Sequence, residues 1–192
     1  MNRIINIKIK NKSYKINIED NSIKKKLNKI ISLEKKVIFL IDKNVFYVFK
    51  KLRNYKKQNY ILINCSEKIK SFDNFAKISE KILKMGIDRN SLIVSIGGGS
   101  LGDLSGFIAS TLLRGIDLVL VPTTLLSQVD SSIGGKNGIN TISGKNLVGT
   151  FYQPKNVLID PSLLLTLPKR EILSGYSEIV KHSIIKDKKF FY

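Results

Sequence analysis

The feature that constrains the fold most is an apolar run that ends in three glycines and continues as an apolar segment. Residues 91–96 read Ser-Leu-Ile-Val-Ser-Ile and lead directly into Gly97-Gly98-Gly99. A continuous apolar run of this length is typical of a parallel strand that is buried on both faces. The apolar segment 104–113 predicts a helix. Together they predict one strand–turn–helix unit of an α/β protein.

The rest of the chain repeats this alternation. Further buried strands are predicted at 36–42, 60–64 and 118–121. Two alternating strands within 4–18, joined by a turn at 11–13, and helices at 21–32 and 73–85 complete the pattern. Strands that alternate with helices predict a doubly wound, Rossmann-like parallel sheet.

From Pro168 onward the pattern changes to one helical period without strands. We therefore expect an α/β domain over residues 1–165. Residues 166–192 are expected to form the first helix of a second, all-α domain.

Composition limits the classes of protein. The net charge is +18, and residues 1–90 hold 23 basic and 8 acidic side chains, against 10 and 7 in residues 91–192. The basic residues lie among Ile and Asn rather than among aromatic residues, so we interpret them as a solvated surface and expect no nucleic-acid site. One cysteine excludes an internal disulfide, and no apolar run approaches the roughly 18 residues of a membrane span. We expect a cytoplasmic protein without a membrane partner.

The glycine-rich turn is the first candidate site. Gly97, Gly99 and Gly102 satisfy the spacing G-x-G-x-x-G, and the N-terminus of the following helix offers N–H groups suited to a phosphate. The alternative is a tight turn without a ligand. Asp42, at the tip of an earlier strand, fits either a ribose hydroxyl or a helix cap.

Two Gly-Lys pairs follow the last predicted strand. Lys136 and Lys145 each follow a glycine, and Asn and Ser residues flank them. A lysine contributes a point charge and three donors, which suits an anionic or polyhydroxylated ligand. The alternative interpretation is glycine turns with surface lysines.

The last predicted helix carries Glu178, Lys181 and His182 on neighbouring turns, and Thr166 is a candidate cap at its entry. A Glu and a His four residues apart fit either a shared metal ion or a solvated helix face.

Six sequence blocks together resemble the 3-dehydroquinate synthase family of sugar-phosphate cyclases, over its N-terminal portion. The blocks read GGGSLGDLSGF, LLRG, PTTLLSQVDSSIGGKNGIN, GKNLVGTFYQP, LTLPKRE and GYSEIVKH. The resemblance implies a carbon–oxygen lyase that converts 3-deoxy-arabino-heptulosonate 7-phosphate into 3-dehydroquinate and phosphate, in the shikimate pathway of aromatic amino acid biosynthesis. It also implies NAD, a divalent metal ion (zinc or cobalt) and a homodimer in the full-length family.

The resemblance implies roles for single residues. The cofactor-binding set is Asp42, Glu67, Lys70, Gly97, Gly98, Gly99, Ser100, Leu101, Gly102, Asp103, Thr123, Thr124 and Thr166, with Lys136 and Lys145 also near NAD. The substrate site is lined by Arg114, Asp130, Lys136, Lys145, Asn146 and Lys181. Glu178 is implied as a metal ligand, and His182 is given a structural role.

The family's other metal ligands are two histidines beyond position 192, whereas this sequence has one histidine. We therefore expect the chain to be incomplete and inactive alone. Two alternatives stay open: another sugar-phosphate cyclase, and an inactive NAD-binding remnant.

Overall fold

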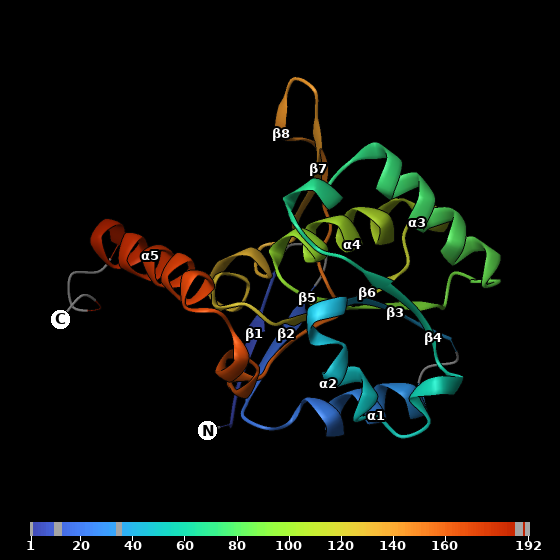
Figure 1. Cartoon of the computed structure of the whole chain (residues 1–192), viewed down its shortest axis with the longest axis horizontal. Helices are drawn as coiled ribbons and strands as arrows, with labels where there is room; N and C mark the ends of the chain where they lie inside the picture. The colour runs from blue at the N-terminus through green and yellow to red at the C-terminus, as the bar shows by residue number, and fades with distance from the viewer. Residues whose placement is uncertain (1, 10–12, 34–35, 187–189, 191–192) are drawn as a thin grey trace.

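The computed structural model describes residues 2–9, 13–33, 36–186 and 190, and a seven-stranded sheet lies at its centre (Figure 1). The strand order is β1-β2-β9-β6-β5-β3-β4. In this order, every pair of neighbouring strands is parallel except β1 and β2, which pair antiparallel at one edge of the sheet. The strands are β1 (Asn2–Ile7), β2 (Tyr14–Glu19), β3 (Val37–Asp42), β4 (Asn59–Ile63), β5 (Leu92–Gly97), β6 (Asp117–Pro122) and β9 (Asn156–Ile159).

Helices cover both faces of this sheet, which confirms the predicted doubly wound α/β class. Helices α1 (Ile23–Leu33) and α2 (Phe46–Lys50) lie on one face, and α3 (Phe72–Lys84) and α4 (Gly99–Thr111) lie on the other (Figure 1). Side chains alternate along β3: Ile38 and Leu40 enter the core beneath α3 and α4, and Phe39 and Ile41 enter the core beneath α1 and α2. Burial on both faces explains the continuous apolar runs of the central strands.

Helix α4 begins at Gly99, five residues before the predicted start at 104, so that prediction was wrong. Glycine lowers helix propensity, but close packing around the first turn determines where this helix begins. A Cβ atom on Gly99 would lie 2.7 Å from Ser131 Oγ, and one on Gly97 would lie 2.7 Å from Leu101 Cδ2. These two glycines let the first turn of α4 lie close to its neighbours.

A hairpin of β7 (Lys136–Thr141) and β8 (Gly144–Phe151) rises from the α3–α4 side (Figure 1). The sequence suggested only turns here, because glycines interrupt the alternation that marks a strand. The structure shows why they are needed: a Cβ atom on Gly149 would lie 2.1 Å from the Asn137 carbonyl oxygen. Strand β9 also escaped sequence analysis, whereas α2 lies within the segment 43–50 for which Asp42 was a candidate helix cap.

Short helical turns connect the larger elements. They are η1 (Lys43–Val45), η2 (Tyr55–Lys57), η3 (Glu67–Ile69), η4 (Leu112–Arg114), a π-helical turn η5 (Ser127–Ser131) and η6 (Pro161–Thr166).

Helix α5 (Lys169–Lys186) extends away from the sheet and contacts η5 (Figure 1). It confirms the helix predicted after Pro168, whereas the domain boundary at 165/166 stays a prediction. Residues 11–12 of the predicted turn and 187–189 near the end of the chain lie outside the described residues. Among the helices that the structure describes, none combines the length and apolar character needed to cross a membrane.

Candidate active site

The carboxyl ends of β3, β5 and β6 meet at one edge of the sheet and line a cleft, here called the glycine-turn cleft. The chain order reverses between β3 and β5, which is where open α/β sheets bind ligands. The lining includes Asp42, Cys65, Glu67, Gly98, Gly99, Ser100, Leu101, Asp103, Thr123, Thr124, Thr166 and Glu171. Most of the predicted cofactor-binding residues thus line one cleft.

The N-terminus of α4 faces this cleft. Gly98 is its cap residue, and within the described part of the chain no side chain caps the first turn. The free N–H groups and the positive end of the helix dipole suit a phosphate or pyrophosphate group. Ser131 Oγ is also buried there without a hydrogen-bond partner among the described residues. The cleft therefore fits a dinucleotide cofactor.

Asp42 has the capping role that the sequence left open, whereas its role at a ribose hydroxyl stays a prediction. One of its carboxylate oxygens caps η1 by accepting a hydrogen bond of 3.0 Å from the Asn44 amide, and the residue also lines the cleft. Burial and the neighbouring Asp42 carboxylate raise the pKa of the Cys65 thiol well above its usual value. Cys65 is therefore a protonated neighbour of Asp42.

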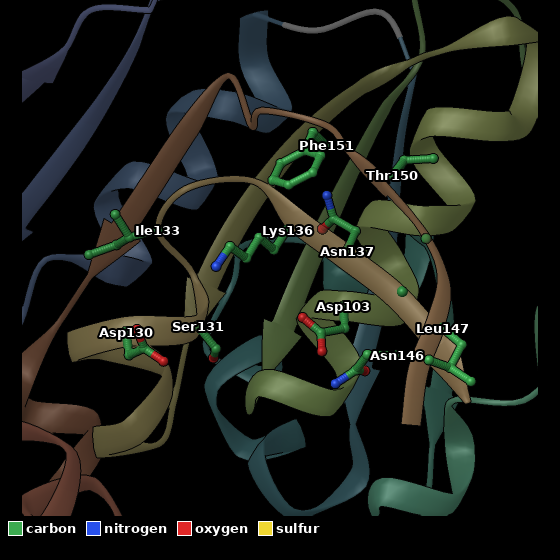
Figure 2. Close-up of a pocket in the computed structure, with 12 residues that line it drawn as sticks. Asp103, Asp130, Ser131, Ile133, Lys136, Asn137, Asn146, Leu147, Thr150 and Phe151 are labelled. Carbon is green, nitrogen blue, oxygen red and sulfur yellow. The ribbon is translucent and has the colours of Figure 1, made fainter. Parts of the chain in front are cut away.

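A second pocket lies beside the hairpin and has a volume of about 550 Å³ (Figure 2). This hairpin pocket is lined by Asp103, Asp130, Ser131, Ile133, Lys136, Asn137, Gly138, Asn146, Leu147, Gly149, Thr150 and Phe151. Figure 2 shows Asp103 and Asn146 on one side and Asp130 and Ser131 on the other, with Lys136 between them in this view. Asp103 and Ser131 line both pockets, so the two pockets adjoin at these residues.

A buried lysine connects the walls of the two pockets. Lys70 is 3% exposed, and its Nζ lies 2.6 Å from Asp103 Oδ2 and 3.5 Å from Glu67 Oε1. The same ammonium group donates to the Asn146 side-chain oxygen on β8. A buried charge is stable only when paired and hydrogen-bonded, and Lys70 meets both conditions. It thus joins η3, α4 and the hairpin at one point.

Glu67 extends this network. Its carboxylate accepts hydrogen bonds from Ser100 Oγ at 2.8 Å and from Asn140 Nδ2 at 3.0 Å. Burial raises the pKa of the Glu67 carboxyl, but the hydrogen bonds from Asn140 and Ser100 and the Lys70 charge outweigh it and leave that pKa below its usual value. Glu67 is therefore held as a carboxylate.

The pKa of the Asp103 carboxyl moves the other way. Burial raises it, Lys70 opposes that change, and the charges of Glu67 and Asp130 add to the increase. A carboxylate with a raised pKa between two pockets is a common feature of functional sites.

A cluster of metal-donor side chains lies between η5 and α5. One donor atom each from Asp130, Glu178 and His182 lies within 4.8 Å of the others. One imidazole nitrogen and two carboxylate oxygens form a donor set that suits zinc or cobalt and leaves a coordination position open. The residues present therefore fit a divalent metal ion.

Lys181 lies beside this cluster and donates a hydrogen bond to Glu178. That hydrogen bond raises the pKa of the Lys181 ammonium group.

Two predicted substrate residues stand apart. Arg114 and Lys145 are exposed and lie outside the lining of both pockets as the structure describes them. Arg114 and Leu113 lie in η4, directly after α4, and both have positive φ, 67° and 52°, which is unusual for residues with a side chain. Their roles stay predictions.

Sequence analysis missed Asn140 and Ser131. Asn140 bridges the network by donating to Glu67 and accepting from the Asn146 amide at 3.0 Å. Both residues lie inside the block PTTLLSQVDSSIGGKNGIN, but only the folded hairpin brings Asn140 to Glu67. His182 faces the carboxylates of Glu178 and Asp130, and the structural role expected for it stays a prediction.

The fold and the site define an open α/β protein with a ligand site at the carboxyl edge of a parallel sheet. The family model described as 3-dehydroquinate synthase N-terminal matches residues 60–174. The curated 3-dehydroquinate synthase of Prochlorococcus marinus subsp. pastoris (strain CCMP1986 / NIES-2087 / MED4) is 43% identical over 200 residues, covering 99% of this chain and 55% of that protein. The chain therefore belongs to the 3-dehydroquinate synthase family, and it spans about half the length of the curated relatives it matches.

Solved structures with the same fold include other sugar-phosphate cyclases. A 2-deoxy-scyllo-inosose synthase complexed with carbaglucose-6-phosphate, NAD⁺ and Co²⁺ is 27% identical, with a TM-score of 0.81 over 95% of this chain and 52% of that one. The 2-epi-5-epi-valiolone synthase from Streptomyces hygroscopicus subsp. jinggangensis 5008, with NAD⁺ and Zn²⁺ bound, is also 27% identical, with a TM-score of 0.83 over 95% of this chain and 52% of that one.

Proposed function

We propose that the chain binds NAD in the glycine-turn cleft and a sugar phosphate in the hairpin pocket, as part of a 3-dehydroquinate synthase. The reaction converts 3-deoxy-arabino-heptulosonate 7-phosphate into 3-dehydroquinate and phosphate. The observation that carries the proposal is the meeting of the two pockets at Asp103 and Ser131, because hydride transfer needs cofactor and substrate side by side.

The chain's own residues have distinct tasks in this proposal. The first turn of α4 binds the cofactor pyrophosphate, and Asp42 binds the adenosine ribose. Lys136 offers positive charge to the substrate phosphate or carboxylate. The Glu67–Lys70–Asp103 network orients the two pockets relative to each other. When bound, NAD supplies a hydride acceptor and donor, and a divalent metal supplies a Lewis acid that lowers the pKa of an alcohol.

The curated relatives favour this reaction over those of the neighbouring cyclases. The 3-dehydroquinate synthases are about 43% identical to the chain, whereas the solved cyclases that make other rings are 27% identical. We also propose a cytoplasmic homodimer that does not bind nucleic acid.

The direct test is NAD binding by isothermal titration calorimetry, with two matched variants. Asp42 ends β3 at the cleft, and Asp117 begins β6 at the opposite edge of the sheet. Asp42→Ala should weaken NAD binding about tenfold or more, because a charge-assisted hydrogen bond contributes about 1.5–3 kcal/mol. Asp117→Ala should bind NAD like the wild type. A wild-type chain that does not bind NAD would contradict the proposal.

The reaction itself is tested by phosphate release. The chain, alone and with an extract of its host, is supplied with NAD, zinc and either the heptulosonate phosphate or glucose 6-phosphate. Release from the heptulosonate phosphate supports the proposal, and release from glucose 6-phosphate alone would assign another cyclase. NAD binding without release from either sugar in both settings would favour the inactive remnant.

A further inference from the structure

Strand β4 leaves one edge of the central sheet open. It is the last strand in the sheet order, and among the described strands it pairs only with β3 (Figure 1). The backbone N–H and C=O groups that point away from β3 are therefore available to a further strand. The strand reads Asn-Tyr-Ile-Leu-Ile, without a proline or a charged residue. It thus lacks the prolines and charges within the strand by which proteins commonly protect such an edge.

A groove, here called the β4 groove, runs along this edge. Two adjoining cavities of about 330 and 460 Å³ form it, and Ile61, Leu62 and Lys81 line both. One cavity reaches Ile63 and the other reaches Tyr60, so the groove follows the strand along its length. Because an added strand lies about 4.8 Å from its neighbour and extends alongside it, an extended peptide matches the course of this groove.

Four exposed lysines line the β4 groove. Lys77, Lys81 and Lys84 are four and three residues apart in α3, so they lie on one face of that helix. Lys68 comes from η3, at the end of the groove that follows Ile63. Among the ion pairs of the described residues, none involves these four ammonium groups. Their charges are therefore available to an occupant of the groove.

The charge of the groove has one sign. Of the described residues that line it, none is acidic. The two acidic residues of α3, Asp73 and Glu80, are exposed outside this lining. A surface with charge of one sign attracts a ligand of the opposite sign.

We propose that the β4 groove binds an extended acidic segment of a partner protein by strand addition to β4. Main-chain hydrogen bonds to the open edge supply the affinity, and acidic side chains at alternate positions of the segment meet the lysines of α3. A nucleic acid would attract the lysines but could not continue the hydrogen-bond ladder of the strand. The inference is independent of the proposed function, because β4 and the four lysines lie outside the described lining of the glycine-turn cleft and the hairpin pocket.

The lysines disfavour a second copy of this chain as the occupant. If two β4 edges paired with each other, the lysines of two α3 helices would approach one another, and like charges across an interface repel. An open edge without charges in the strand would otherwise favour self-association. The positive charge beside β4 therefore admits an acidic segment and opposes a second copy.

The test uses a synthetic heptapeptide of alternating Glu and Val as the probe. It is titrated into the full chain, and the backbone amide resonances are followed by NMR. The expected result is a saturable shift confined to β4, η3 and α3, with slower hydrogen exchange of the β4 amides in the complex. Binding should weaken as the salt concentration rises, because salt screens exposed charges.

Two control peptides separate charge from strand addition. A heptapeptide of alternating Lys and Val has the wrong charge and should not bind. The Glu-Val peptide with alternate amides N-methylated keeps its charges but loses the donors of one edge, so it should bind at least about tenfold more weakly. Equal binding of either control and the Glu-Val peptide would overturn the inference.

Matched variants locate the site. Lys77→Glu/Lys81→Glu should weaken binding of the Glu-Val peptide about tenfold, because two attractions become two repulsions. Lys24→Glu/Lys25→Glu makes the same change on α1, which covers the other face of the sheet, and should bind like the wild type. Thermal unfolding checks that both variants are folded.

Three results would contradict strand addition by an acidic partner. One is a wild-type chain whose β4 amides do not shift with the Glu-Val peptide. Another is an equal loss of binding in the two double variants, because the charge would then act from the whole surface. The third is protection of the β4 amides that grows with protein concentration in the absence of peptide, because a second copy would then occupy the edge.

Discussion

At the scale of single residues, the buried ammonium group of Lys70 has the largest consequences. Side chains from three elements, η3, α4 and β8, reach it, and one of them, Asp103, lies between the two pockets. The sequence indicated Lys70 only through its resemblance to a family motif. The sequence does not indicate that Lys70 is buried and paired, because two of its partners, Asp103 and Asn146, are 33 and 76 residues away along the chain.

Lys70→Met should lower the free energy of unfolding by about 3 kcal/mol, because Asp103 loses its buried partner. Urea unfolding measures the loss. The double variant Lys70→Met/Asp103→Asn should lose less, since no unpaired carboxylate remains. Equal losses in the single and double variants would contradict this account of the pair.

Asp160 is a second residue with a structural role that sequence analysis missed. It is 1% exposed, and its carboxylate accepts hydrogen bonds from the amides of Asn21, Ser22 and Ile23 at the start of α1. Burial raises the pKa of this carboxyl, but hydrogen bonds from Ser162 and the α1 amides outweigh it and leave that pKa below its usual value. The folded state therefore favours the carboxylate.

A lowered pKa in the folded state means that the stabilisation is present above the unfolded pKa of about 3.9 and is lost as the pH falls through the folded value. Asp160→Ala should cost about 2 kcal/mol of unfolding free energy at pH 7, because the amides of Asn21, Ser22, Ile23 and Ser162 lose their acceptor. The difference between the variant and the wild type should shrink below about pH 4. Denaturant unfolding at a series of pH values checks both, and a difference independent of pH would refute the role of the charge.

At the scale of elements, the central strands were predictable, whereas the hairpin and the start of α4 were not. Strands β3 and β5 are buried on both faces. Because apolar side chains are favoured at buried positions, both strands can be recognised in the sequence as apolar runs. The hairpin has exposed residues, and its glycines allow two backbone segments to lie close together. Close backbone contacts of this kind produce no periodic pattern of apolar residues in the sequence.

Helix α5 depends on one such contact, because a Cβ atom on Gly175 would lie 2.6 Å from Leu125 Cβ and from the Leu126 amide nitrogen. Gly175→Ala would favour an isolated helix by about 0.5–1 kcal/mol. In this position the added Cβ should instead displace α5 from Leu125, destabilise the fold by about 1–3 kcal/mol and weaken Co²⁺ binding at the cluster of metal-donor side chains between η5 and α5. Thermal unfolding and Co²⁺ titration measure the two effects.

Gly102→Ala in α4 is the matched control for that helix contact. Its Cβ would meet nothing nearer than Leu120 Cδ2 at 4.0 Å, so stability should rise by about 0.5–1 kcal/mol. If both alanine variants were stabilised, close packing at Gly175 would be refuted.

At the scale of the whole molecule, the site exists because the hairpin is docked on the sheet domain. Asn137 lies against Gly106 of α4 and donates hydrogen bonds to the carbonyl oxygens of Gly135 and Tyr152 at 2.7 and 3.0 Å. This contact places Lys136 and Asn146 beside Asp103, so the hairpin pocket depends on it.

Gly106→Ala should loosen this docking, since its Cβ would lie 1.7 Å from Asn137 Oδ1. Hydrogen exchange should accelerate in β7 and β8 while β5 and β6 keep their protection. Uniform acceleration would mean global destabilisation, and no acceleration would mean that the hairpin is held elsewhere.

The sequence by itself determined the class of the fold, the glycine turn, the family and most of the residues along the cleft. These features are local, because strand burial, helix periodicity and the order of motifs can each be recognised from residues that are close together in the sequence. Only the tertiary structure decided that Lys70 joins two pockets, that Asp160 caps α1 and that His182 meets Asp130. Each of these depends on contacts between segments far apart in the chain, and their geometry follows from packing rather than from any spacing that the sequence displays.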